Sequence, residues 1–145
     1  VLFNFLTRLE RAMLHPLFAM TLLIFIIALI TVRTRFAAVK SGAMSGSYFK
    51  TMSGAEPPSA VAKTTRQFNN LFETPTLFYA AGILYLALDL NTALTVQFAW
   101  AYVALRLIHA IIHIGYNNVM HRLVAFAASL LCIGGMWICL LLEAG

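Results

Sequence analysis

Hydrophobic residues occur along this chain in four long runs, separated by polar segments. The runs extend over approximately residues 14–34, 62–88, 91–116 and 120–143. Each is close to the roughly 20 mostly apolar residues that a helix needs to cross a bilayer. The pattern therefore predicts an all-α integral membrane protein. Because the later connections are short, we expect one antiparallel bundle of four transmembrane helices over residues 1–145.

The one long polar segment, residues 35–61, is rich in Gly, Ser and Pro, as loops are. Basic residues gather around it and around the turn at 117–121, whereas the other side has Arg8 and Arg11. Cytoplasmic flanks of membrane helices are enriched in Lys and Arg. We therefore expect a cytoplasmic loop at 35–61 and both termini outside. The flanking cations are Arg33, Arg35, Lys40, Lys50, Lys63 and Arg122.

Composition supports the membrane interpretation and removes two others. The chain has 145 residues, of which 61% are hydrophobic and only 10% charged, far from a soluble domain. The net charge of +5 is explained by membrane topology, so we expect no nucleic-acid partner.

Cys132 and Cys139 are about 10 Å apart along a helix, beyond disulfide reach, and are interpreted as apolar side chains. No basic segment precedes a short apolar core at Val1, so we expect no cleaved signal peptide.

Two stripes of polar residues interrupt the hydrophobic runs. At about 100° per residue, Arg66, Asn70 and Glu73 fall within about 60° of one another on the second helix. On the third helix a similar stripe contains Arg106, His109 and His113, with Tyr102 and Tyr116 beside it. Glu73 and Arg106 each lie about 15 Å from the cytoplasmic end of their helices. We therefore expect these two side chains to meet and neutralise each other.

A packing role explains the Glu73–Arg106 pair, because an unpaired ion at the membrane centre costs about 3 kcal/mol or more. It does not explain why Arg66, Asn70, the two histidines and Arg122 converge on the same half of the membrane. Ionisable groups clustered at one depth usually line a site or a water-filled cavity. The excess of cations over anions favours an anionic ligand.

The histidines permit other interpretations. His109 and His113 have the i, i+4 spacing of metal ligands, with Glu73 and His121 as further candidates. However, no glutamate follows the first histidine as in the zincin pattern, and the cationic surroundings oppose a divalent ion. We therefore expect no metal. Hydrogen bonds across helices and contact with a ligand remain open for both rings.

These spacings resemble a known superfamily. The pattern Arg66-x3-Asn70-x2-Glu73, the segment "RLIHAIIHIGYNNVMHR" from Arg106 to Arg122, and the basic "VRTRF" at the end of the first span are similar to the membrane-associated proteins in eicosanoid and glutathione metabolism, the MAPEG superfamily. The resemblance covers all four spans. It implies a homotrimer of four-helix bundles that binds glutathione between neighbouring subunits, near the cytoplasmic side.

The resemblance also implies roles for individual residues. Arg66 would bind a carboxylate of glutathione, Asn70 its peptide and Glu73 its ammonium group. Arg122 would stand beside the sulfur and act as the catalytic residue. A thiol with a pKa near 8.5 is mostly protonated at neutral pH, and a cation within about 4–6 Å lowers that pKa by roughly 1–3 units. The remaining candidates for contact with glutathione are Arg106, His109, His113, Tyr116 and either Arg33 or Arg35.

Departures from the family pattern narrow the function. His113 replaces a common tyrosine, Thr74 follows Glu73 where eicosanoid-making members often have tyrosine, and Gln67-Phe68 replaces a small polar pair. These changes resemble a bacterial branch rather than leukotriene or prostaglandin synthases, and imply a bacterial inner membrane with the site facing the cytoplasm. We expect a glutathione-dependent transferase or peroxidase that uses glutathione as co-substrate and takes a lipophilic substrate from the membrane lipids. The alternative is a non-catalytic trimer whose polar stripe serves packing or binds another small anion.

Overall fold

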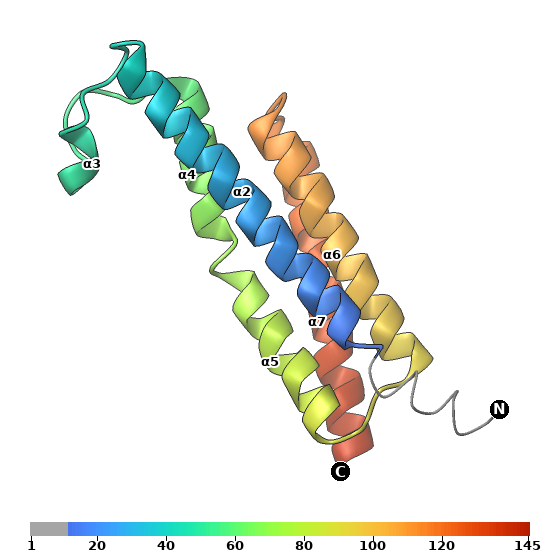
Figure 1. The fold of residues 1–145 in the computed structure, drawn as a ribbon. Coiled ribbons are helices and arrows are strands. Elements are labelled where there is room, and N and C mark those ends of the chain that lie inside the picture. The colour runs from blue at the N-terminus through green and yellow to red at the C-terminus, as the bar shows by residue number, and fades with distance from the viewer. Residues whose placement is uncertain (1–11) are drawn as a thin grey trace.

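The computed structural model describes residues 12–145, so Arg8 and Arg11 lie outside the described residues. This part of the chain is helical apart from its connections (Figure 1). The helices are α2 (Leu14–Lys40), α3 (Tyr48–Thr51), α4 (Ser59–Asn70), α5 (Thr74–Ala87), α6 (Ala93–Ile114) and α7 (Val119–Ala144).

The long helices form an antiparallel bundle. Figure 1 shows α4 and α5 following one another along one line, with α6 and α7 as a hairpin beside them. Helix α2 packs on α4, α5 and α6. One end of the bundle carries α3, the start of α4 and the α6–α7 turn, and we call it the loop end. The start of α2 and the end of α7 lie at the opposite end (Figure 1).

Within residues 12–145, three single helices are long and apolar enough to cross a membrane, namely α2, α6 and α7. The second predicted span, 62–88, is not one continuous helix, and this part of the prediction is wrong. It is divided into α4 and α5 by a turn at residues 71–73. Pro75 explains the division, because its ring would clash with the carbonyl of Leu71 in an uninterrupted helix and it has no N–H to donate.

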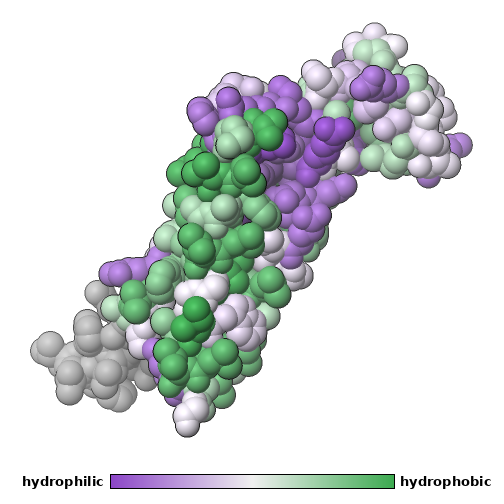
Figure 2. Space-filling view, turned by 180° about the vertical axis from the view of Figure 1, so that it is seen from behind, coloured by the Kyte–Doolittle hydropathy of each residue, from purple (hydrophilic) through white to green (hydrophobic). Residues whose placement is uncertain are grey.

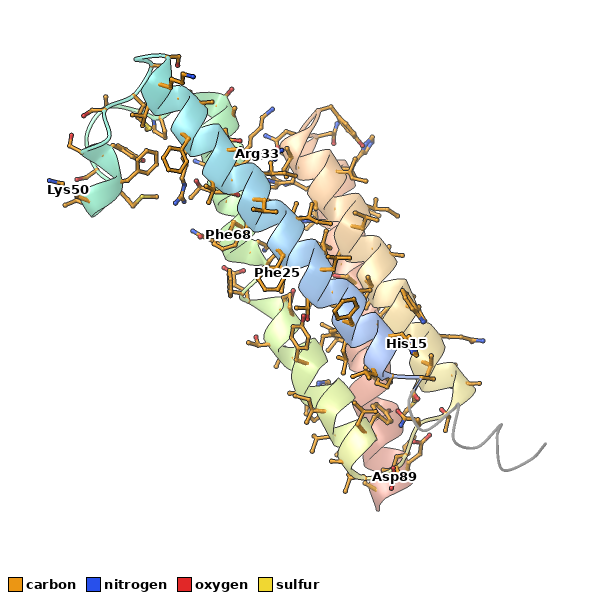
Figure 3. All side chains as sticks on the ribbon, in the orientation of Figure 1. His15, Phe25, Arg33, Lys50, Phe68 and Asp89 are labelled. Atoms are coloured by element: carbon orange, nitrogen blue, oxygen red, sulfur yellow. The ribbon has the colours of Figure 1, made fainter. Side chains whose placement is uncertain are left out.

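The loop is shorter than predicted. Helix α2 continues to Lys40 and α4 begins at Ser59, while the short α3 lies between them. Residues 35–40 and 59–61 are therefore helical rather than part of the loop. In Figure 3, α3 with Lys50 stands to one side of the α2–α4 pair, and Asp89 marks the opposite end of the bundle.

Aromatic side chains connect the helices inside the bundle. Phe78 of α5 stacks on Tyr102 of α6, with ring centroids 4.5 Å apart. The buried Tyr85 hydroxyl donates to the carbonyl oxygen of Met136 on α7 at 2.6 Å. Large hydrophobic side chains cover the outward faces, as expected of a surface in contact with lipid. This packing holds α5, α6 and α7 together below the polar residues described next.

Candidate functional site

A polar groove opens at the loop end between α4 and the α6–α7 hairpin. Figure 2 shows hydrophilic residues gathered over this half of the molecule, above a hydrophobic lower half. The groove has a volume of about 350 Å³, within the range of roughly 300–1,000 Å³ that is usual for small-ligand sites. Its lining residues are Arg66, Asn69, Asn70, Glu73, His109, His113 and Arg122.

Helix α4 and the turn after it supply one wall of the groove. The Arg66 side chain is exposed, and that of Asn70 is partly buried in the last position of α4. Glu73 occupies the position just before α5, and its side chain is exposed. The three residues line one groove although they do not belong to one helix. The break therefore leaves the predicted polar stripe together on the same side.

Asn70 connects the two predicted ionic partners. Arg106 Nη2 donates to Asn70 Oδ1 at 2.6 Å and to the Asn70 carbonyl oxygen at 3.2 Å. Asn70 Nδ2 in turn donates to Glu73 Oε2 at 3.3 Å. Among the described residues, the expected direct contact between Glu73 and Arg106 is replaced by this bridge, because the carboxylate begins a new helix beyond the turn.

Helix α6 supplies the buried wall. Arg106 is fully buried, and the His109 and His113 rings are nearly so. The two rings stack with centroids 5.7 Å apart. Phe126 of α7 packs against Arg106 and His109. Its ring centroid is 5.6 Å from Arg106 Cζ and 5.9 Å from the centroid of the His109 ring. The second predicted stripe therefore does share one inward-facing side of its helix.

Arg122 is positioned by the turn between α6 and α7. Helix α6 ends at Ile114, and Asn117 in the turn that follows has φ +55°. The Asn118 side chain accepts from the backbone N–H of His121 and so caps α7. Arg122 lies in the first turn of α7, and its Nη1 donates to Asn117 Oδ1 at 2.7 Å. The local sequence thus holds the guanidinium at the mouth of the groove.

The groove continues toward the loop. An adjoining cavity of about 430 Å³ shares Arg66, His113 and Arg122 with it. Lys63 lines this extension and donates from Nζ to the carbonyl oxygen of Gly115 at 3.1 Å. The other lining residues are Glu56, Pro57, Ser59, Ala62 and Asn117. An elongated zwitterionic ligand therefore has charged partners of both signs along its length.

Four of the expected ligand residues do not line either cavity. Arg33 is exposed near the loop end of α2 (Figure 3). Arg35 donates from Nη2 to Thr65 Oγ1 at 3.1 Å and lies over the Phe49 ring. The Tyr116 hydroxyl is 2.9 Å from His121 Nδ1, in an exposed pair. Arg106 is also set behind the lining, where it acts through Asn70.

Sequence reasoning missed two polar residues on α4. Asn69 lines the groove three residues after Arg66, and its helical spacing could have revealed it. Gln67 is fully buried, and neither atom of its side-chain amide has a hydrogen-bond partner within residues 12–145. Nothing in the hydrophobic pattern indicated that this glutamine faces the bundle interior. No group of three or more His, Cys, Asp or Glu side chains in the described part of the chain is placed to hold a metal.

Comparison with known proteins adds one match. The model of the MAPEG family matches residues 13–142 of the chain. The matched region includes α2, α6, the divided pair α4–α5 and α7 up to residue 142, so the match extends over each of the four helical segments of this multi-pass integral membrane protein. No curated protein and no solved structure matches the chain.

Proposed function

Because the chain belongs to the MAPEG family, we propose that it is a membrane-bound, glutathione-dependent transferase or peroxidase. Its second substrates would be lipophilic electrophiles or lipid hydroperoxides. The observation that supports this proposal is the single groove in which Arg66, Asn70, Glu73 and Arg122 gather. These residues match the family motif and come from α4, the turn before α5 and the first turn of α7.

Glutathione fits the charges of the groove. It has two carboxylates, one ammonium group, two peptide bonds and a thiol. In this proposal Arg66 binds a carboxylate with its planar fork of donors, Asn70 bonds a peptide group and Glu73 holds the ammonium group. Asn69, His109 and His113 line the space between them. Arg106 orients Asn70 through the 2.6 Å hydrogen bond and so contributes indirectly.

Arg122 is the proposed catalytic residue. Its guanidinium stabilises the thiolate of glutathione, and the thiol proton passes to solvent at the open groove. In transfer, the sulfur forms a bond to an electrophilic carbon, and the leaving group departs with its electron pair. In peroxide reduction, the sulfur attacks the terminal oxygen of the hydroperoxide as the O–O bond breaks, and the departing oxygen takes a proton from solvent and leaves as the alcohol. The thiol of a second glutathione then attacks the resulting sulfenic acid, which gives the disulfide and water.

The assembly and orientation are part of the same proposal. We propose a homotrimer with its glutathione sites near the cytoplasmic side, because the loop end carries most of the basic flanking residues. Arg33 is exposed and does not line the groove of its own chain. It is therefore assigned to the site of a neighbouring subunit.

Glutathione binding to the detergent-solubilised protein tests the proposal. Calorimetry measures affinity, and the ultraviolet absorbance of the bound thiolate measures activation. We expect Arg122→Ala to lose the thiolate band and at least about tenfold in turnover, while Arg122→Lys keeps part of both, since one pKa unit is tenfold in thiolate. Lys40→Ala, which removes an exposed cation at the end of α2, is the matched control and leaves both unchanged.

One observation favours the non-catalytic alternative. The Arg106–Asn70–Glu73 bridge joins α6 to the α4–α5 turn and would stabilise the bundle without any ligand. If no binding is detected at millimolar glutathione, the enzyme proposal is wrong and the polar residues serve packing or another small anion.

A further inference from the structure

A second groove lies at the loop end, between α2 and α3, and its walls are apolar. It has a volume of about 370 Å³. Its lining residues are Val32, Arg35, Phe36, Val39, Gly46 and Phe49. The α2 members recur at three- and four-residue intervals, so they form one continuous helical face. Arg35 is the one charged residue among the six.

Arg35 is held in a fixed orientation in this wall. Its Nη2 donates to Thr65 Oγ1 on α4 at 3.1 Å, and its Cζ lies 5.4 Å from the centre of the Phe49 ring. Both partners are uncharged, so neither compensates the positive charge. A guanidinium stacked on an aromatic ring loses little further conformational freedom when it binds an anion.

The depth of the groove in the membrane indicates what could occupy it. The apolar part of α2 from Leu14 to Val32 is about 28 Å long at 1.5 Å per residue, close to the roughly 30 Å of a hydrocarbon core. Val32 therefore lies at the edge of the hydrocarbon, and Arg35 lies among the lipid headgroups. At this level, basic pockets between membrane helices bind acidic headgroups.

We propose that this groove binds an anionic phospholipid of the bilayer leaflet at the loop end, with its phosphate on Arg35 and an acyl chain between Phe36 and Phe49. The charge and the apolar walls together match an amphiphile. A second copy of the chain is a poorer match for its carboxylates. Asp89 and Glu143 lie at the other end of the bundle, whereas Glu73 lines the polar groove and Glu56 lines its extension. The site is independent of the glutathione groove, which Arg35 does not line.

Native mass spectrometry of the delipidated full chain in neutral detergent tests the proposal, with phosphatidylglycerol and phosphatidylcholine as probes. We expect phosphatidylglycerol to bind more tightly to the wild type. Arg35→Gln should weaken that binding about fivefold or more, since one basic residue near a lipid surface contributes on the order of 1 kcal/mol. Arg33→Gln is the matched control, because it removes the same charge about 200° away on the same helix.

A second variant keeps the test decisive if Arg35→Gln folds poorly. Phe36 is 73% exposed, so Phe36→Ser should fold and should weaken binding of long-chain but not of dihexanoyl phosphatidylglycerol. Equal losses in Arg33→Gln and Arg35→Gln would reduce the effect to general surface charge and overturn the proposal. Equal binding of the two lipids would also overturn it. So would an Arg35→Gln variant that dissociates the oligomer with lipid binding intact, because the groove would then be an interface between copies.

Discussion

The buried guanidinium of Arg106 depends on a single side chain for its shortest hydrogen bond. Asn70 Oδ1 accepts that bond at 2.6 Å, whereas Nε and Nη1 of Arg106 have no partner within residues 12–145. A hydrogen bond to a charged group contributes about 1.5–3 kcal/mol, and a buried charge without a partner is strongly destabilising. Asn70 therefore has a structural role at this residue that does not depend on glutathione.

Replacing Asn70 should accordingly reduce the stability of the ligand-free protein. We expect Asn70→Ala to lower the free energy of unfolding by about 2 kcal/mol, because it removes the side-chain acceptor of Arg106. Asn69→Ala, at the exposed neighbouring position, should change it by less than about 0.5 kcal/mol. Thermal unfolding in detergent without glutathione compares the two. Equal stability of both variants would mean that the bond to the Asn70 carbonyl oxygen suffices.

At the scale of elements, the division of the second span places the candidate ligand residues on two separate elements. Helix α4 contributes Arg66 and Asn70, whereas the turn and the start of α5 place Glu73. We attribute the division to Pro75 and expect Pro75→Ala to allow α4 to continue through residues 71–73. Hydrogen exchange at residues 71–76 should then slow by at least about tenfold, since helical amides are hydrogen-bonded.

Pro75→Gly is the control for this prediction. Glycine also removes the ring, but it disfavours helix by about 1 kcal/mol relative to alanine. The turn should therefore persist in Pro75→Gly. If the turn also persists in Pro75→Ala, it is set by tertiary packing instead, for example by the fully buried side chain of Leu71.

Hydropathy and helical spacing predict elements well in this chain because lipid imposes simple rules. Span length and backbone hydrogen bonding in lipid gave four spans near the observed helices, and angular spacing placed His109 and His113 on one buried face. Pro75 was present in the sequence as a signal for the break. The positions of Arg35 and Tyr116 were not predictable, because they depend on how α3 and the α6–α7 turn fold back, which no periodicity encodes.

At the scale of the whole molecule, the proposed trimer determines which chain supplies each cation. Arg66 and Arg122 line one groove of a single chain, whereas Arg33 is exposed and lines neither that groove nor its extension. In a closed symmetric oligomer, an exposed residue of one subunit can complete the site of the next. Mixed trimers built from two different variant chains should therefore differ in glutathione turnover, depending on whether the two replaced cations serve the same groove from one chain or from two.

Co-expression of tagged chains measures this difference. In trimers that combine Arg66→Ala with Arg122→Ala chains, every groove lacks one of the two cations, so we expect glutathione turnover to stay as low as in the single variants. In trimers that combine Arg33→Ala with Arg122→Ala chains, about a quarter of the subunit boundaries pair an intact Arg33 with an intact groove, and activity should return in that proportion. Recovery in the first pair would show that Arg66 and Arg122 act from different chains. The groove seen within one chain would then not be the glutathione site.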